Sequence, residues 1–472
     1  MRFLFTCIPG LGHFNPLVPL ARALTASGHD VAFASAPSFA DAITQGGFEF
    51  IPAGCDWDER RLLETVPELR ARSRIVRGEW MMRNLFLDRS PRRMVPDLLR
   101  IIPEWRPDVL IAGSFEYGGL LAAEKAGLPY ASATYTIPWN RWILRHAVGR
   151  RIAAIREEFG LPPDPRLESF GRYLDLCFAP PSWRFERALL DGALVRLVRA
   201  KVLSFDLPLR QRLWGLRALL LQKLFARSLR AHPEDAVLPA STHFIGDADQ
   251  PAAPEPALSQ IDRMPRQPFV FVSLGTVLSA EYPDIFDKIL IGLRDKPVNL
   301  IMTMGGKADP ARFGPLPENI CIFDFITQDD LRRLLPHVDL CVNHAGYSSV
   351  VEALSYGVPL LLLPLTSDAP MNTRMCMIDG VTASLPPEVW GISPKGLPVI
   401  RAERLTSDIL ADVILQALHD PAYKAAAVRM QQTMTQRPGP KAAVKLLEEL
   451  ARSSSAGMGQ ACLGSSPTHG SA

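Results

Sequence analysis

The stretch Phe3-Leu4-Phe5-Thr6-Cys7-Ile8 is an apolar run of the length expected for one buried strand. It is followed by an amphipathic pattern typical of a helix at residues 17–27 and by a second strand-like run at residues 31–35. A strand, a helix and a strand in this order predict a β-α-β unit, and hence a parallel sheet. The chain therefore opens with an α/β domain.

A second series of the same kind begins at Phe269. Strands are expected there at residues 269–273, 299–304, 320–323, 340–343 and 359–364, with helices between them. The stretch that separates the two series is crowded with prolines, which favours a linker. The predicted organisation is a first domain at 1–246, a linker at 247–268 and a second domain at 269–420. Closing helices at 421–452 are expected to return to the first domain, and a disordered Ser/Gly-rich tail is expected at 453–472.

The composition of the chain argues against several classes of protein. With 472 residues, 47% hydrophobic and 21% charged, the chain can form two globular domains, and a net charge of +3 does not point to nucleic acid. Its seven cysteines are scattered without a Cys-x-x-Cys pair, so we expect neither a zinc site nor a disulfide framework, and a cytoplasmic location. We also expect no signal peptide and no membrane span of roughly 20 apolar residues.

Residues 183–232 are unusually rich in leucine and arginine. One interpretation is a set of helices with solvated charged faces that pack on a sheet. The other is contact with a membrane surface or a lipid acceptor, because basic amphipathic helices bind such interfaces. The sequence leaves both interpretations open.

The first strand runs into the turn Pro9-Gly10-Leu11-Gly12-His13-Phe14-Asn15-Pro16. This is not a dinucleotide-binding fingerprint, because Asn15 occupies the position of the third glycine. The turn places His13 at the edge of a sheet where α/β proteins bind ligands. An imidazole with a pKa near neutrality is suited to accept a proton from a hydroxyl group, although a histidine in a turn can also be a capping or packing residue.

In the second series, the strand at 340–343 runs directly into His344-Ala345-Gly346-Tyr347-Ser348-Ser349. Small residues after a strand let a helix begin close to a ligand, and the free N–H groups and dipole of that helix attract phosphate. The strand end Ser273-Leu274-Gly275-Thr276 could meet the same anion. Serine at a helix start is also ordinary N-capping, so each feature alone is weak.

Several motifs in their order and spacing resemble glycosyltransferase family 1, the antibiotic and plant natural-product glycosyltransferases of GT-B architecture. The similarity extends over nearly the whole chain, to about residue 451. The matching pieces are Gly12-His13-Phe14-Asn15-Pro16, Arg106-Pro107-Asp108-Val109-Leu110, Gly160-Leu161-Pro162-Pro163, Val272-Ser273-Leu274-Gly275-Thr276, His344-Ala345-Gly346, Glu352-Ala353-Leu354-Ser355-Tyr356-Gly357-Val358-Pro359 and Leu363-Pro364.

The resemblance implies two Rossmann-like domains that face each other across a cleft, with the acceptor on the first domain and the donor on the second. It implies that His13 is the general base. The expected donor-binding residues are Thr276, Phe325, Ile326, Gln328, His344, Gly346, Ser348, Ser349, Glu352 and Asp368. In such enzymes oriented dipoles replace a metal ion, so no metal or further cofactor is expected. The Asp-x-Asp triplet at 247–249 lies in the proline-rich linker, and we do not interpret it as a metal site.

Three sites, with four residues among them, depart from the family pattern. Gly113 stands where an Asp usually orients the histidine, so we expect Glu116 to take that role, with Ser114 as the alternative. Ala369 stands where an amide usually holds sugar hydroxyls, which fits a deoxy sugar or reduced activity. Tyr347 and Ser348 replace smaller residues and could narrow the diphosphate site.

The sequence thus predicts an inverting, metal-independent hexosyltransferase. It moves a hexose or deoxyhexose from a UDP- or TDP-sugar to a hydroxyl of a small hydrophobic natural product, as a monomer or homodimer without nucleic acid. The acceptor is expected to contact Phe14, Trp80, Met82, Phe86, Trp139 and Trp142. Two rivals stay open: a lipid or sterol glycosyltransferase at a membrane surface, and a non-catalytic partner protein that binds nucleotide sugar.

Overall fold

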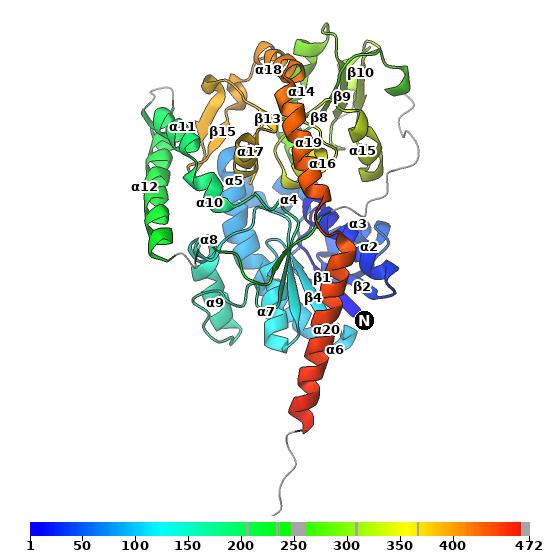
Figure 1. Ribbon diagram of the computed structural model, residues 1–472, viewed down its shortest axis with the longest axis vertical. Coiled ribbons are helices and arrows are strands. Elements are labelled where there is room, and N and C mark those ends of the chain that lie inside the picture. The colour runs from blue at the N-terminus through cyan, green and yellow to red at the C-terminus, as the bar shows by residue number, and fades with distance from the viewer. Residues whose placement is uncertain are drawn as a thin grey trace, which may run out of the picture.

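The computed structural model describes residues 1–203, 207–232, 235, 237–246, 261–306, 310–365 and 368–463. Within them, two parallel sheets form the centres of two domains, one above the other in Figure 1. The first sheet has seven strands in the order β3-β2-β1-β4-β5-β6-β7, and the second has six in the order β10-β9-β8-β11-β12-β13.

The seven strands expected from the sequence are present close to the expected positions, as β1, β2 and β8 to β12. Those of the first sheet are β1 Arg2–Thr6, β2 Asp30–Ser35, β3 Glu49–Pro52, β4 Val109–Gly113, β5 Tyr130–Thr134, β6 Leu174–Cys177 and β7 Thr242–Phe244. Those of the second sheet are β8 Phe269–Ser273, β9 Asn299–Thr303, β10 Ile320–Phe323, β11 Leu340–Asn343, β12 Leu360–Leu362 and β13 Thr382–Ala383. An antiparallel pair, β14 Trp390–Ile392 and β15 Pro398–Ile400, follows them.

Helices connect the strands and cover both faces of each sheet. In the first half they are α1 Leu11–Phe14, α2 Val18–Ala26, α3 Ala40–Gln45, α4 Leu62–Thr65, α5 Arg74–Met81, α6 Ser90–Trp105, α7 Tyr117–Ala126, α8 Arg141–Leu144, α9 Arg150–Glu158, α10 Phe185–Leu190, α11 Gly192–Leu203 and α12 Leu209–Ala231. In the second half they are α13 Gly275–Glu281, α14 Pro283–Leu293, α15 Gln328–Leu334, α16 Tyr347–Ser355, α17 Ala369–Ile378, α18 Ser407–His419, α19 Pro421–Thr435 and α20 Pro440–Leu463.

The first sheet is buried on both faces because its central strands are apolar throughout. Along β1, Phe3 and Phe5 belong to the core that includes α2 and α20, whereas Leu4 belongs to the core under α6 and α7. This alternation follows from the two-residue period of a strand. The register sets Phe5 beside Phe33 of β2 and Ile111 of β4.

The last two helices link the domains. The core cluster that contains Phe5 continues into the second domain through α19 and α20. The buried Arg437, between these helices, donates hydrogen bonds to the carbonyls of Phe178, Ala179 and Ile245 at 2.8, 3.0 and 2.9 Å. In Figure 1 α20 runs beside the first sheet and projects beyond it. It continues to Leu463, so the expectation of a disordered tail from residue 453 is wrong for 453–463, and residues 464–472 lie outside the described part.

The Leu/Arg-rich segment forms α10, α11 and α12, which pack along the junction of the domains, with α12 against β14 of the antiparallel pair. Trp183 donates from Nε1 to Asp379 at 3.0 Å, and the Gln211 amide oxygen accepts from the N–H of Ile392 at 3.2 Å. Both contacts join the first domain to the second.

The strand order places the functional edge of each domain. Each sheet reverses its order at one point, between β1 and β4 in the first and between β8 and β11 in the second. Ligands of open parallel sheets bind beyond the carboxyl ends of the strands at such points. The loops that follow these four strands carry His13, Phe115, Thr276 and His344.

Candidate active site

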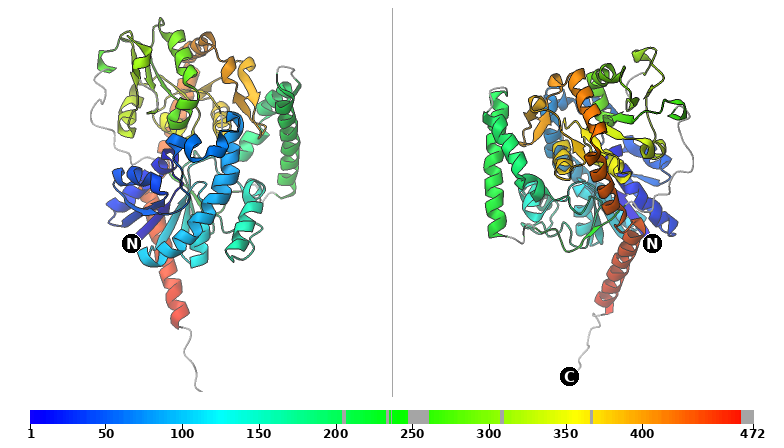
Figure 2. Two further views of the ribbon diagram at one scale, coloured as in Figure 1. Left: turned by 180° about the vertical axis from the view of Figure 1, so that it is seen from behind. Right: turned by 45° about the horizontal axis from the view of Figure 1, so that its top comes forward.

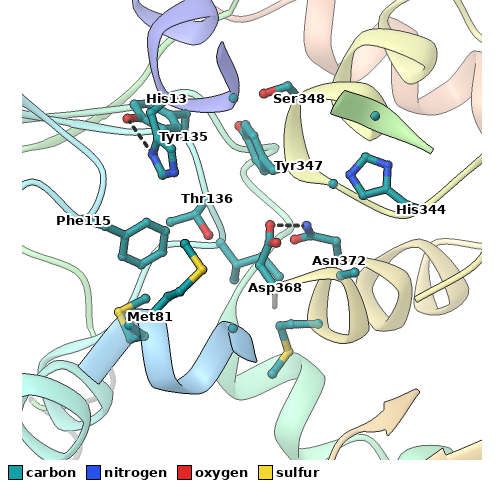
Figure 3. A pocket seen from close by; sticks show the side chains of 18 of the residues that line it. His13, Met81, Phe115, Tyr135, Thr136, His344, Tyr347, Ser348, Asp368 and Asn372 are labelled. Atoms are coloured by element: carbon teal, nitrogen blue, oxygen red, sulfur yellow. Dashed lines mark hydrogen bonds between the residues drawn. The ribbon is translucent and has the colours of Figure 1, made fainter. Parts of the chain in front are cut away.

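One cavity of about 1140 Å³ lies between the domains, lined by all four switch-point loops. In Figure 3, His13 and Tyr135 lie on one side of this pocket and His344 on the other, with Tyr347 between them in the view. The salt bridge of Arg77 on α5 with Glu281 on α13, at 2.6 Å, also crosses from one domain to the other.

His13 sits in α1, the single helical turn that follows β1, among aromatic rings. The ring centroids of Phe86, Phe115 and Tyr135 lie 6.0, 6.2 and 5.9 Å from that of the imidazole. Burial lowers the pKa of His13 to about 4, and a hydrogen bond with the backbone of Ser114 opposes the shift only in part. The imidazole is therefore neutral at physiological pH and able to accept a proton.

Tyr135, just beyond β5, occupies the space next to His13 that an Asp at position 113 would need. Its hydroxyl lies 3.3 Å from Nδ1 of His13 and 3.5 Å from the carbonyl oxygen of Ser114. A Cβ atom on Gly113 would lie only 2.7 Å from that hydroxyl oxygen. Glycine at 113 thus leaves space for a tyrosine that follows the neighbouring strand β5, a partner of His13 that was not predicted from the sequence.

Glu116 does not reach His13, so the prediction that it orients the imidazole is wrong. It is the N-cap of α7, where its carboxylate accepts from the N–H groups of Gly118 and Gly119 at 2.9 and 2.8 Å. The hydroxyl of Thr6 donates to it at 2.6 Å. A buried carboxylate at a helix start is stabilised by these donors and by the helix dipole, which explains its position.

Two loops of the site contain a non-glycine residue in the left-handed region, which costs free energy and marks functional sites. Phe115, after β4, has φ 67°, and Ala345, after β11, has φ 64°. Ala345 is held by two asparagines: its N–H donates to Asn343 Oδ1 at 2.8 Å, and its carbonyl accepts from Asn372 Nδ2 at 3.0 Å.

His344 packs tightly against two glycines, and a larger residue at either position would displace the imidazole. A Cβ atom on Gly346 would lie 2.4 Å from Nε2 of His344, and one on Gly275 would lie 2.7 Å from its Cε1. Nδ1 of His344 is buried and has no hydrogen-bond partner among the described residues. Burial lowers the pKa of the imidazole, whereas Asp368 and a backbone hydrogen bond with Ser273 raise it.

The expected donor-binding residues line the same cavity. They are Thr276, Phe325, Ile326, Gln328, His344, Gly346, Ser348, Ser349, Glu352 and Asp368. Phe325 is 47% exposed, so its ring is open to a ligand, and the Gln328 amide donates a hydrogen bond to the carboxylate of Glu352. Tyr347 also lines the cavity, with its ring edge-on to Trp183 at 6.3 Å.

The corner around Asp368 contains an amide that the sequence analysis missed. Ala369 is buried at the start of α17 and brings no polar side chain. One turn later, Asn372 donates from Nδ2 to Asp368 at 2.8 Å. Its Oδ1 is buried without a hydrogen-bond partner among the described residues. Residues four apart share one face of a helix, which could have suggested this pair.

Four of the six expected acceptor contacts line the cavity, and two do not. The four are Met82, Phe86, Trp139 and Trp142. Phe14 is buried in the core, with its ring 5.1 Å from Phe33, because it lies on the inner side of the turn that carries His13. Trp80 faces away, where its ring packs under the guanidinium of Arg72 at 5.2 Å.

No group of three or more acidic, histidine or cysteine side chains in the described residues could hold a metal ion. The Asp-x-Asp triplet at 247–249 lies outside those residues.

Two parallel-sheet domains whose switch points face one cavity are the arrangement of the GT-B fold. Residues 22–180 match the N-terminal domain, and residues 294–450 the C-terminal domain, of the family described as erythromycin biosynthesis protein CIII-like. The chain belongs to this family of antibiotic glycosyltransferases.

Curated relatives cover the chain almost completely. It is 26% identical over 460 residues to demethyllactenocin mycarosyltransferase of Streptomyces fradiae, covering 94% of this chain and 86% of the relative. It is 26% identical over 471 residues to 10-deoxymethynolide desosaminyltransferase of Streptomyces venezuelae, covering 96% and 97%. Among solved structures, glycosyltransferase VinC in complex with dTDP has the same fold, with a TM-score of 0.64, 22% identity and coverage of 96% and 100%. The protein is a glycosyltransferase that transfers a sugar from a nucleotide-sugar donor to a natural product.

Proposed function

We propose that the protein transfers a deoxy sugar from a TDP-sugar to a hydroxyl group of a hydrophobic natural product, with His13 as the general base. The observation that carries the proposal is that one cavity holds the neutral His13 on an aromatic wall and the His344 loop at a helix start. The acceptor in the name of one relative, 10-deoxymethynolide, and the dTDP bound by one structural neighbour support it.

In this mechanism the acceptor hydroxyl gives its proton to Nε2 of His13 while its oxygen attacks the anomeric carbon of the donor. The bond from that carbon to the diphosphate oxygen breaks, and the nucleoside diphosphate leaves with inversion. Nδ1 of His13 keeps its proton and donates it to the hydroxyl oxygen of Tyr135, which itself donates to the carbonyl of Ser114. This chain of hydrogen bonds keeps Nε2 free to accept.

The diphosphate is bound at the start of α16, where the free N–H groups and the helix dipole stabilise negative charge. The buried Nδ1 of His344, without a partner in the described residues, supports this assignment because it can donate to a phosphate oxygen. Phe325 then stacks on the nucleotide base, and Glu352 accepts from the ribose.

The donor sugar contacts Asp368 and the free Oδ1 of Asn372. Ala369 contributes no amide, so this corner has fewer hydrogen-bond partners than the family pattern. A sugar that lacks a hydroxyl group needs fewer partners, which favours a deoxy sugar over a hexose.

The test has two stages. First, the purified protein is screened for thermal stabilisation by TDP, UDP and their sugars, because a ligand of the native state raises Tm. Stabilisation by UDP compounds alone would contradict the TDP assignment.

Second, turnover is measured with the best donor and a panel of macrolide-type acceptors for the wild type and His13→Ala, with the exposed His419→Ala as the control. We expect His13→Ala to lower turnover by about 10² or more with donor affinity nearly unchanged. A chelator should leave turnover intact.

The rival function, a non-catalytic partner protein, was suggested by Gly113 and Ala369. Tyr135 gives His13 a partner where the carboxylate is missing, and a deoxy donor sugar accounts for Ala369, so these two departures no longer favour it. Donor binding without turnover on any acceptor would revive it. The cytoplasmic location and the monomeric or dimeric state stay predictions.

A further inference from the structure

Helix α12 has an inner face that packs against the rest of the protein. A Cβ atom on Gly215 would lie 2.3 Å from Cγ2 of Val202 and 2.9 Å from Cδ1 of Ile392, so the helix approaches α11 and β14 closely. Phe225 is buried, with its ring 4.6 Å from that of Trp142. The same face lines the acceptor side of the cavity.

The outer face of α12 is a stripe of exposed leucines. The exposed fractions of its members are 68% for Leu209, 54% for Leu213, 51% for Leu216, 60% for Leu220 and 50% for Leu224. Spacings of three and four residues put all five on one side of a helix over about 22 Å. Figures 1 and 2 show α12 at the outer edge of the molecule in every view. A contiguous exposed apolar surface of this kind indicates an interaction site.

Positive charge surrounds this leucine stripe, and α12 contains no acidic residue. Its cations are Arg210, Arg212, Arg217, Lys223, Arg227 and Arg230. By helical geometry Arg210 and Arg217 lie along one edge of the stripe, and Lys223 and Arg230 along the other. The preceding helix α11 also has basic but no acidic residues. The ligand of this face must therefore offer both apolar groups and a dense negative charge.

We propose that the outer face of α12 docks on an anionic lipid surface. The leucines enter the boundary between headgroups and acyl chains, while the flanking cations contact lipid phosphates. No helix in the described residues has the length and hydropathy to cross a bilayer, so the contact is peripheral. A second copy of the chain fits less well, because pairing two α12 helices through their leucines would bring two uncompensated positive rows together. This contact goes beyond the proposed function and does not depend on it.

The experiment is co-sedimentation of the full chain with phosphatidylcholine vesicles, with or without phosphatidylglycerol. We expect binding only to the anionic vesicles and its loss at high salt, because salt screens the charges. The double variants Leu213→Gln/Leu220→Gln and Lys223→Gln/Arg227→Gln should each lower the partition coefficient about tenfold or more. Ile291→Gln, at a residue of α14 that is 68% exposed, is the control and should bind like the wild type.

Unchanged Tm and nucleotide binding in the variants establish that they are folded. Equal binding to neutral vesicles, or variants that sediment like the wild type, would overturn the proposal. The proposal would also be overturned if the wild type did not bind vesicles but formed a dimer that the leucine variant converts to monomers. The leucine stripe would then be an interface between copies of the chain.

Discussion

The hydrogen bond between Tyr135 and His13 can be tested by Tyr135→Phe, which removes one oxygen atom and leaves the buried ring in place. Burial keeps the pKa of Tyr135 well above its usual value, so the hydroxyl stays protonated and can donate to Ser114 while it accepts from His13. Without it, Nδ1 of the imidazole loses this acceptor, and only the backbone of Ser114 among the partners described above still holds the ring, so the proton moves more readily to Nε2, where it blocks the base.

The size of the effect follows from the geometry. At 3.3 Å the contact is long for a hydrogen bond, and both groups are neutral, so we assign it about 0.5 to 1 kcal/mol. This corresponds to a roughly two- to fivefold lower kcat, with the KM for the donor unchanged because Tyr135 lies on the acceptor side.

The assay is steady-state turnover with saturating donor. Tyr130→Phe is the matched control. Tyr130 lies in β5 and does not line the cavity, and its hydroxyl donates a buried hydrogen bond of 2.8 Å to the carbonyl of Ser169, which the variant loses. It should lower Tm and leave kcat unchanged. A kcat of Tyr135→Phe equal to that of the wild type would refute the positioning role.

A second pair of variants uses the clash at Gly113. Gly113→Asp alone should lower kcat and Tm, since its Cβ meets the Tyr135 hydroxyl at 2.7 Å. In a Tyr135→Ala background the closest contact of the Asp is removed and those with Leu17 and the Thr6 carbonyl, at 3.3 Å, remain, so the Asp should raise kcat above that of Tyr135→Ala. The absence of this sign reversal would show that the two positions are independent.

The remaining predictions concern the donor site, the cap of α7 and the pH profile. His344→Ala should weaken TDP binding in calorimetry by about 1.5 to 3 kcal/mol, with the exposed His337→Ala unchanged; equal affinity would place the diphosphate elsewhere. Glu116→Gln should cost about 1 to 2 kcal/mol of stability and leave kcat within about twofold, and a loss of kcat at constant Tm would contradict its capping role. Because His13 must be unprotonated to act, kcat/KM should stay level well below pH 6.5 and fall as the pH drops through about 4; a fall centred near 6.5 would contradict the burial argument.

The periodicity of the sequence was enough to predict the two sheets. The strands at 320–323 and 340–343 coincide with β10 and β11, because apolar runs between helical patterns report the local backbone directly. The positions of His13 and His344 followed as well. A residue just after a strand of a parallel sheet lies at its carboxyl edge, whatever else surrounds it.

Which side chains meet at that edge was decided only by the tertiary structure. Tyr135 and Gly113 are neighbours because β5 pairs with β4, and sheet order is not contained in the period of either strand. Glu116 lies three residues from Gly113 but caps α7, because the N–H groups of Gly118 and Gly119 at the helix start donate to its carboxylate.

The choice between core, cavity and surface depended on packing in the same way. Phe14 and Phe86 are the same residue type near the same histidine, yet one is buried in the sheet core and the other lines the pocket. In α12 the leucines of the stripe, which recur every three or four residues, are exposed, while Phe225 on the opposite side of the helix is buried. The composition of the segment determined that it is apolar and basic. Which face of α12 meets solvent was decided by its packing against α11 and β14, because the burial of a side chain depends on neighbours that are distant in the chain.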